Sequence, residues 1–299
     1  MAGNILVTGA TGLVGTALIK ELYKRNRKEV RAAFHTGSVT SMLKTYSSEQ
    51  IRLEFGDFST IDRAFQGITS LFLVTPFARE QVEFARRMID RALLFGVDHI
   101  VNLSILGAQQ EPGTQFTRWH RRIEKYLENC GVAYTILRPN IYMQNFLRYA
   151  QPSGGFIYLP LNNAKVSYID VADVATVAAE VIIAGKPHYA QTYELTGPQA
   201  LTVDDVTHII SSAVGSHIGY IPISEETALH IMESLGIPAW KAKGMLELYS
   251  MQREGKNEMV SSTTETLCNC KPTSFEEFVY KNVSTFKEIV HHEHQTYPH

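Results

Sequence analysis

A glycine-containing turn near the N-terminus is the feature of this sequence that most constrains its fold. The apolar run Ile5 to Val7 leads into Gly9, Gly12 and Gly15, and apolar residues at helical spacing follow. This order predicts a β-strand, a tight turn and an α-helix. Gly9 would permit the tight turn, Gly12 would let a pyrophosphate approach the main chain, and Gly15 would let the helix lie close to the strand. The N-terminus of that helix would offer unpaired N–H groups to the phosphates. We therefore predict a dinucleotide-binding βαβ unit; a glycine-rich turn without a ligand is the alternative.

Strand and helix patterns alternate after this turn. Five further strands are expected at 29–34, 51–55, 70–74, 99–104 and 132–139. Residues 70–74 are uniformly apolar, as expected of a parallel strand that is covered on both faces. The alternation predicts the α/β class, with a Rossmann-type, doubly wound parallel sheet and right-handed crossovers.

The C-terminal part has a different character. Bulky apolar residues lie between Trp240 and Met251, and few candidate catalytic groups accompany them. We expect residues 1–155 to form the dinucleotide-binding domain, to which 164–200 return, and 201–299 to form mainly a smaller α/β substrate lobe, with 156–163 contributing. Such a lobe would supply walls of a ligand pocket, although a core role for these side chains is the alternative.

Composition excludes several classes of function. The chain has 299 residues and a formal net charge of −2, which gives no electrostatic reason to expect nucleic acid or a membrane surface as a partner. No apolar run approaches the roughly 20 residues that span a bilayer, and the first strand begins too early to leave room for a signal peptide. We expect a small-molecule substrate and a monomer or homodimer.

The cysteines indicate a reducing environment. There are three of them, Cys130, Cys268 and Cys270, so they cannot all pair, and a cytoplasmic location is expected. Cys268 and Cys270 lack the usual spacing of metal ligands, and the histidines after residue 290 lie on a polar tail. We therefore expect no metal site.

The end of the second predicted strand bears on which nicotinamide cofactor fits. An acidic residue there would hydrogen-bond the adenosine ribose and repel a 2′-phosphate, but the chain has His35, Thr36, Gly37 and Ser38. These groups and the nearby Lys44 can donate hydrogen bonds to a phosphate. NADP(H) is therefore favoured over NAD(H), with an ordinary loop histidine and a solvated lysine as the alternatives.

Polar residues also follow the next strands. Asp57 and Phe58 come after the third strand, where an adenine ring would lie, and Ser59 is expected to cap the following helix. An Asp that only forms a turn is the alternative for Asp57. Thr75 follows the fourth strand and Ser104 ends the fifth. Because the carboxyl ends of parallel strands share one edge of the sheet, these residues are expected near the cofactor.

The next helix would carry the acid–base chemistry of a short-chain dehydrogenase, the type to which the G-x-x-G-x-x-G spacing points. A Tyr-x-x-x-Lys pair is expected there, but His120 and Glu124 occupy that spacing. Glu124 could hold one tautomer of His120 or raise its pKa. A structural histidine on the apolar stripe of the helix is the alternative. Further on, Asp170 is expected to cap a helix, and capping is preferred over catalysis for Asp170 and Asp173.

Four separated motifs resemble the NmrA-like family of atypical short-chain dehydrogenases, over nearly the whole chain. They are residues 7–15 (VTGATGLVG), 120–125 (HRRIEK), 134–146 (YTILRPNIYMQNF) and 166–175 (VSYIDVADVA). The family includes NADPH-dependent quinone reductases, triarylmethane-dye reductases and redox-sensing regulators that bind the cofactor without turning it over. Many members carry Arg, which is always charged, where this chain has His35.

The resemblance implies two sets of site residues. Cofactor contacts are implied for Gly9, Thr11, Gly12, Leu13, Val14, His35, Asp57, Thr75, and Asn102 to Ser104. The nicotinamide end is implied to be lined by Pro139, Asn140 and Tyr142.

We therefore predict an NADP(H)-dependent oxidoreductase that passes a hydride to a quinone-like or conjugated aromatic molecule. His120 and Tyr142 are the candidate catalytic residues, as optional proton donors. A non-catalytic sensor of the cofactor is the main alternative, because the Tyr and Lys are missing. An isomerase or cyclase that keeps the nucleotide as a fixture is a third possibility.

Overall fold

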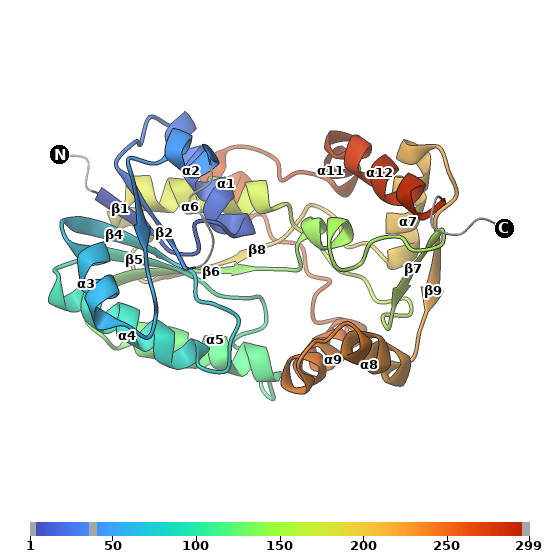
Figure 1. Ribbon diagram of the computed structural model, residues 1–299, viewed down its shortest axis with the longest axis horizontal. Helices are drawn as coiled ribbons and strands as arrows, with labels where there is room; N and C mark the ends of the chain where they lie inside the picture. The colour runs from blue at the N-terminus through green and yellow to red at the C-terminus, as the bar shows by residue number, and fades with distance from the viewer. Residues whose placement is uncertain (1–3, 36–40, 295–299) are drawn as a thin grey trace.

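A parallel sheet organises the N-terminal two thirds of the molecule (Figure 1). The computed structural model describes residues 4–35 and 41–294. The strands of this main sheet are β1 (Asn4–Val7), β2 (Val30–Phe34), β3 (Glu49–Arg52), β4 (Ile68–Leu73), β5 (His99–Leu103), β6 (Ala133–Pro139) and β8 (Gln191–Leu195). Their spatial order is β3-β2-β1-β4-β5-β6-β8, and every pair is parallel. The chain reverses its direction of travel between β1 and β4, which confirms the doubly wound Rossmann-type fold.

Helices cover both faces of this sheet. They are α1 (Leu13–Lys24), α2 (Ser41–Tyr46), α3 (Phe58–Phe65), α4 (Gln81–Leu94), α5 (Gln115–Glu128) and α6 (Val171–Ala184). Figure 1 shows α1, α2 and α6 above the sheet and α3, α4 and α5 below it. Successive side chains of each strand point to opposite faces of the sheet and so contribute to two apolar cores. Val7 packs with the upper helices and Leu6 with the lower ones.

The C-terminal lobe surrounds a second, smaller sheet. Its elements are β7 (Phe156–Leu159), α7 (Val203–Val214), β9 (Gly219–Pro222), α8 (Glu225–Ser234), α9 (Ala239–Arg253), α11 (Phe275–Lys281) and α12 (Val283–His294). The two strands pair in parallel, and their own apolar core includes Phe275 and Phe278. The short segments η1 (Met143–Leu147), η2 (Lys186–His188) and α10 (Thr263–Cys268) complete the described chain. The predicted domain boundaries stay a prediction.

Local capping patterns account for several helix starts. Thr202 and Asp205 form a capping box on α7, and Ser274 and Glu277 form one on α11. Asp170 caps α6, as predicted. The prediction that Ser59 caps α3 is wrong. The carboxylate of Asp57 accepts a hydrogen bond from the Ser59 N–H at 2.8 Å, so the helix begins at Phe58.

Tertiary contacts change two other expectations. The third strand ends at Arg52 instead of continuing to residue 55, because β2, with which it pairs, ends at Phe34, the partner of Arg52. Asp173 lies in the first turn of α6 but accepts hydrogen bonds from the backbone N–H and the hydroxyl of Thr273, at 2.8 and 3.1 Å. It thus ties the segment before α11 to α6 instead of capping its own helix.

The described residues contain neither a membrane-spanning helix nor a cluster of metal-ligating side chains. Within 4–35 and 41–294, no helix has the length and apolar character needed to cross a membrane. Over the same ranges, no three side chains of His, Cys, Asp or Glu come together as metal ligands. The three cysteines are free thiols.

Candidate functional site

The glycine turn between β1 and α1 brings the helix close to the strand. Gly9 has a φ of 61°, a left-handed conformation that a residue with a side chain rarely adopts. A Cβ on Gly15 would lie 2.3 Å from the carbonyl oxygen of Gly9, and one on Gly12 would lie 3.1 Å from it. Glycine at these positions therefore lets the first turn of α1 pack on the loop.

The N-terminus of α1 suits an anion. Gly12 is the N-cap, it offers no side-chain hydrogen bond, and the first turn contains no acidic residue. The first N–H groups of a helix have no partner within the helix, and they carry a partial positive charge. Leu13 and Val14, which were predicted to contact the cofactor, begin this turn.

A cavity of about 120 Å³ lies beside this turn, at the carboxyl ends of the strands. It is lined by Thr8, Gly9, Thr11, Ala33, Phe34, His35, Leu53, Phe55, Val74, Thr75 and Pro76. The structure thus brings four predicted residues, Gly9, Thr11, His35 and Thr75, to one place. The mostly apolar walls and the polar turn fit the adenosine and diphosphate portions of a dinucleotide.

Asp57 and Phe58 do not line that cavity. Asp57 is the N-cap of α3, and its carboxylate accepts a hydrogen bond from the Ser59 N–H. The ring of Phe58 is 46% exposed and lies under the guanidinium group of Arg91 on α4, 4.5 Å from ring centroid to Cζ. Their expected contacts with an adenine ring stay predictions without a pocket to support them. Ser38 lies outside the described residues.

An acidic residue lies next to His35, although none follows β2 in the sequence. His35 Nδ1 lies 2.6 Å from a carboxylate oxygen of Glu54, which also pairs with Arg52 at 3.0 Å. Glu54 comes after β3, the neighbour of β2 in the sheet. The end of the second strand contains no acid, as the sequence shows, but the sheet brings a carboxylate to His35 from the neighbouring strand.

A chain of polar side chains runs inward from the cavity. Gln81 is buried, and its Nε2 lies 3.1 Å from the hydroxyl of Thr75 and 3.1 Å from Nε2 of His120. With the amide in this orientation, Nε2 of His120 accepts and the ring proton sits on Nδ1. Neither His120 Nδ1 nor Gln81 Oε1 has a hydrogen-bond partner in the part of the chain that the structure describes. Burial lowers the pKa of His120 to about 4, so the ring is neutral at neutral pH.

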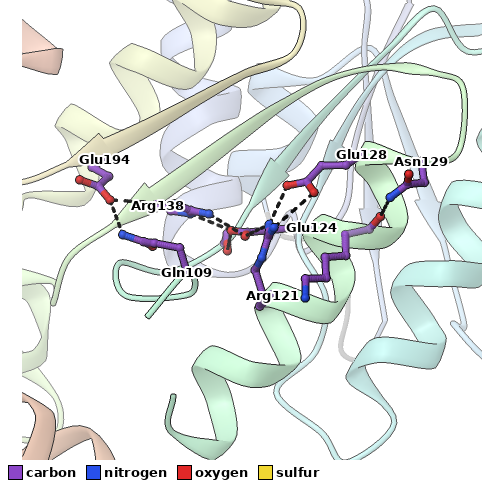
Figure 2. A network of polar contacts seen from close by, with 9 residues as sticks. Gln109, Arg121, Glu124, Glu128, Asn129, Arg138 and Glu194 are labelled. Carbon is purple, nitrogen blue, oxygen red and sulfur yellow. Dashed lines mark hydrogen bonds and ion pairs between the residues drawn. The ribbon is translucent and has the colours of Figure 1, made fainter. Parts of the chain in front are cut away.

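Glu124 acts on His120 in only one of the two predicted ways. Its buried carboxylate accepts hydrogen bonds from Ser104 Oγ at 2.7 Å and from two nitrogens of Arg138 at 2.9 and 2.8 Å. Arg121 approaches at 3.1 Å, and Figure 2 shows Glu124 between the two arginines. Burial alone raises the pKa of Glu124, but the hydrogen bonds and charge of Arg138 and the bond from Ser104 outweigh it, so the pKa lies below its usual value. The prediction that Glu124 holds the tautomer of His120 is wrong, because Arg138 and Ser104 occupy its carboxylate and the His120 ring contacts Gln81 instead. Its charge does raise the pKa of His120, as the other predicted role requires, but burial outweighs this effect.

Asn102, a predicted cofactor contact, and the three residues predicted to line the nicotinamide end differ in whether their polar groups are already hydrogen-bonded. Asn102 on β5 is buried, and its Nδ2 has no partner among the described residues, so it fits a polar ligand group. The amide of Asn140 is already bonded to Ser167 Oγ at 2.8 Å and to the side chain of Asn257 at 2.7 Å. Pro139 ends β6 and is buried. Tyr142 is half-buried against the core above the sheet, and burial raises its pKa.

Comparison of the sequence with known proteins identifies the family of this chain. Residues 1–279 match the NmrA-like family. The chain belongs to the NmrA-like family. It is 30% identical over 285 residues to an NAD(P)H azoreductase from Xenophilus azovorans, covering 94% of this chain and 99% of the relative.

Solved structures of NmrA-like architecture superpose well on the chain. The NADPH-dependent quinone oxidoreductase QOR2 from Escherichia coli, solved with NADPH, has a TM-score of 0.83 at 26% identity and covers 93% of this chain and 99% of that one. A triphenylmethane reductase from Citrobacter sp., solved with NADP(H), has a TM-score of 0.82 at 23% identity, covering 93% and 99% respectively, and shows a shared fold.

The sequence patterns did not indicate three of the residues that form this site. Gln81 has no local signal, because it is simply the first residue of α4. Glu54 is near His35 only through strand pairing. Arg138 could have been found, since a charged residue inside an apolar strand needs a buried partner.

Proposed function

We propose that this protein is an NADP(H)-dependent reductase that delivers a hydride to a quinone-like or conjugated aromatic small molecule. The observation that carries the proposal is the glycine turn with an adjoining cavity at the carboxyl edge of the sheet. Relatives named NAD(P)H azoreductase and quinone oxidoreductase support the reaction class.

The chain's own residues would hold the dinucleotide along that edge. The N–H groups that begin α1 would bind the diphosphate, and the cavity beside Gly9 and Thr75 would take the adenosine. Asn102, whose amide nitrogen has no partner in the described part of the chain, would bind a polar group of the dinucleotide farther along the edge. When bound, the reduced nicotinamide supplies the hydride.

The protonation states of the candidate proton donors favour a hydride acceptor that does not need a proton from an enzyme side chain. His120 is neutral at neutral pH, because burial lowers its pKa to about 4, and the phenol of Tyr142 stays protonated. Among the described residues, no charged side chain hydrogen-bonds either group, and neither has a lysine that lowers its pKa as in a Tyr–Lys pair. Reduction of a quinone places its protons on oxygen atoms that solvent can reach, so this site suits such a substrate.

Preference for NADP(H) would depend on the balance between His35, Arg52 and Glu54. His35 and Arg52 can donate to a 2′-phosphate, whereas the Glu54 carboxylate repels it. We expect Glu54→Gln to lower the Kd for NADPH roughly threefold to fivefold at low salt, because one nearby negative charge is removed. The Kd for NADH should change little. Calorimetric titration with both nucleotides measures this, and equal effects on the two would contradict the proposed position of the 2′-phosphate.

Turnover is tested by following NADPH absorbance with a panel of quinones, azo dyes and triarylmethane dyes. Steady oxidation of NADPH that depends on one of these acceptors supports the reductase. Tight NADPH binding without oxidation by any acceptor would replace it with a cofactor sensor. Activity that persists with the nucleotide locked in one redox state would indicate an isomerase or cyclase.

A further inference from the structure

A buried glutamine connects the predicted cofactor cavity to the helix that carries His120. Gln81 is the first residue of α4, and its side chain is only 2% exposed. Its amide nitrogen lies 3.1 Å from the hydroxyl of Thr75, which lines the cavity, and also 3.1 Å from Nε2 of His120. A single NH2 group therefore has an acceptor for each of its two protons.

The main chain next to Thr75 is held by the neighbouring strand. The hydroxyl of Thr8, which follows β1, accepts a hydrogen bond from the N–H of Val74 at 2.7 Å and donates one to its carbonyl at 2.8 Å. Thr8 and Val74 line the same cavity as Thr75. The backbone at the end of β4 is thus fixed, and Gln81 is the described side chain that hydrogen-bonds the Thr75 hydroxyl.

This pairing leaves the proton of the Thr75 hydroxyl unused. A hydroxyl group can accept one hydrogen bond and donate another. Gln81 donates to Thr75, and no acceptor among residues 4–35 and 41–294 takes the Thr75 proton. Because Thr75 lines the cavity and is only partly buried, its proton is available to an acceptor atom of a ligand that binds there.

The opposite orientation of the amide would reverse the role of Thr75. With its oxygen in place of its nitrogen, Gln81 would take the Thr75 proton and would require a proton on Nε2 of His120. The Thr75 hydroxyl could then only accept a hydrogen bond. The donor role of Thr75 is therefore coupled to the tautomer of His120 through the single amide between them.

The part of a dinucleotide expected in this cavity is rich in acceptors. The glycine turn that suits a diphosphate also lines the cavity, and a ribose would add further oxygens. Hydrogen bonds in a chain polarise one another, so a hydroxyl that accepts from an amide is a stronger donor. Thr75 with Gln81 as its donor therefore suits an oxygen of the diphosphate or the ribose.

We propose that Gln81 is a positioning residue for the cofactor: it orients the Thr75 hydroxyl to donate to an oxygen of the bound dinucleotide, and His120 holds the Gln81 amide in that orientation. This inference rests on the proposed function. It gives Gln81 and His120 a role that is separate from proton transfer to a substrate, and it requires no contact between Gln81 and the dinucleotide.

A double-mutant cycle tests the proposal. Thr75→Val removes the hydroxyl but keeps the shape of the side chain, and the Kd for NADPH should rise roughly threefold to tenfold. Gln81→Met removes the amide and should raise this Kd roughly twofold to fivefold. In the double variant the Kd should equal that of Thr75→Val alone, because Gln81 acts through the hydroxyl. Calorimetric titration measures each Kd.

Gln252→Met is the matched control for the loss of a buried amide. Gln252 is 4% exposed, and its side chain donates to the carbonyl of Leu248 within α9, at 3.2 Å. This variant should leave the Kd for NADPH unchanged. If Gln81→Met raises the Kd by the same factor with and without the Thr75 hydroxyl, Gln81 has only a structural role and the proposal is overturned.

Nitrogen-15 NMR of the histidine rings tests the amide orientation in the unmodified protein. The signals that are absent from His120→Gln belong to His120. In the NADPH complex at neutral pH, the ring should be neutral, with its proton on Nδ1. A proton on Nε2 would mean that Gln81 presents its oxygen to Thr75, which overturns the inference even if Gln81→Met does not fold.

The outcomes separate this inference from the proposed function. If the cycle shows that Gln81 acts through Thr75 but no acceptor oxidises NADPH, the inference stands and the reductase falls. If quinones oxidise NADPH but the effects of the two substitutions on NADPH binding are independent, the reductase stands and the inference falls.

Discussion

Glu124 shows how much a single buried charge depends on its neighbours. Its side chain is fully buried and paired with Arg138, Ser104 and Arg121 (Figure 2). Glu124→Ala would leave the buried guanidinium of Arg138 without its main partner. We expect the free energy of unfolding to fall by about 3–5 kcal/mol, as measured by urea denaturation.

An exposed ion pair supplies the control for this prediction. Glu83 and Arg87 lie on the surface of α4, 3.0 Å apart. Glu83→Ala should cost only about 0–1 kcal/mol, because solvent screens the pair. Equal losses in the two variants would show that the buried network does not contribute in the way proposed.

His120 makes stability depend on pH. Burial lowers its pKa from 6.5 to about 4. Between these values the unfolded chain binds a proton that the folded protein does not, so the free energy of unfolding rises with pH. The contribution is fully present above the unfolded pKa and is lost as the pH falls toward 4.

The corresponding variant isolates that contribution. Between about pH 7 and about pH 5, His120 should lower the free energy of unfolding by about 2 kcal/mol. His120→Gln should remove this part of the dependence of the unfolding free energy on pH. His99, whose pKa burial also lowers to about 4, and Asp173, whose pKa burial raises to about 6, remain in both proteins. The difference between the two pH profiles, from urea denaturation, therefore reports His120; parallel profiles would refute the assignment.

At the scale of an element, the turn before α1 depends on the absence of a Cβ. In Gly15→Ala the new methyl group would lie 2.3 Å from the Gly9 carbonyl oxygen, so the helix must shift. Because the N–H groups that begin α1 would move with it, we expect the Kd for NADPH to rise at least about tenfold. Gly56→Ala is the control, since a Cβ there has no neighbour within 4 Å. Calorimetry on both variants decides between a specific turn and a general sensitivity to added methyl groups.

At the scale of the whole molecule, α9 connects the lobe to the main sheet. Gly244 on α9 faces Phe116 on α5, and a Cβ at this position would lie 2.4 Å from the ring. Gly244→Leu should overpack this junction and lower the free energy of unfolding by about 1–3 kcal/mol. Lys243→Leu, on the exposed side of α9, is the control and should change it little. Hydrogen exchange in α5 and α9 would locate the loss, and an unchanged exchange rate there would contradict a role for this contact.

Local sequence predicted most of the elements and their order. Apolar runs placed the strands β1 to β6 of the main sheet to within a few residues, because the burial of a strand can be read from its own side chains. Capping residues such as Thr202 and Ser274 act within one turn, so their effect can be read from neighbouring letters. The prediction of Ser59 as the N-cap of α3 was wrong, since the side chains of both Asp57 and Ser59 can cap a helix. The position of the preceding strand decides which of the two does so.

The sequence by itself therefore determined the doubly wound fold, the glycine turn and the family, all of which depend on residues close together in the chain. Only the tertiary structure decided which side chains act on one another across it. It brings Glu54 to His35, Gln81 to His120 and Arg138 to Glu124. The physical reason is that hydrogen bonds and ion pairs need their atoms within about 3 Å of one another. Which side chains come that close depends on how neighbouring strands and helices pack, and no local sequence pattern specifies it.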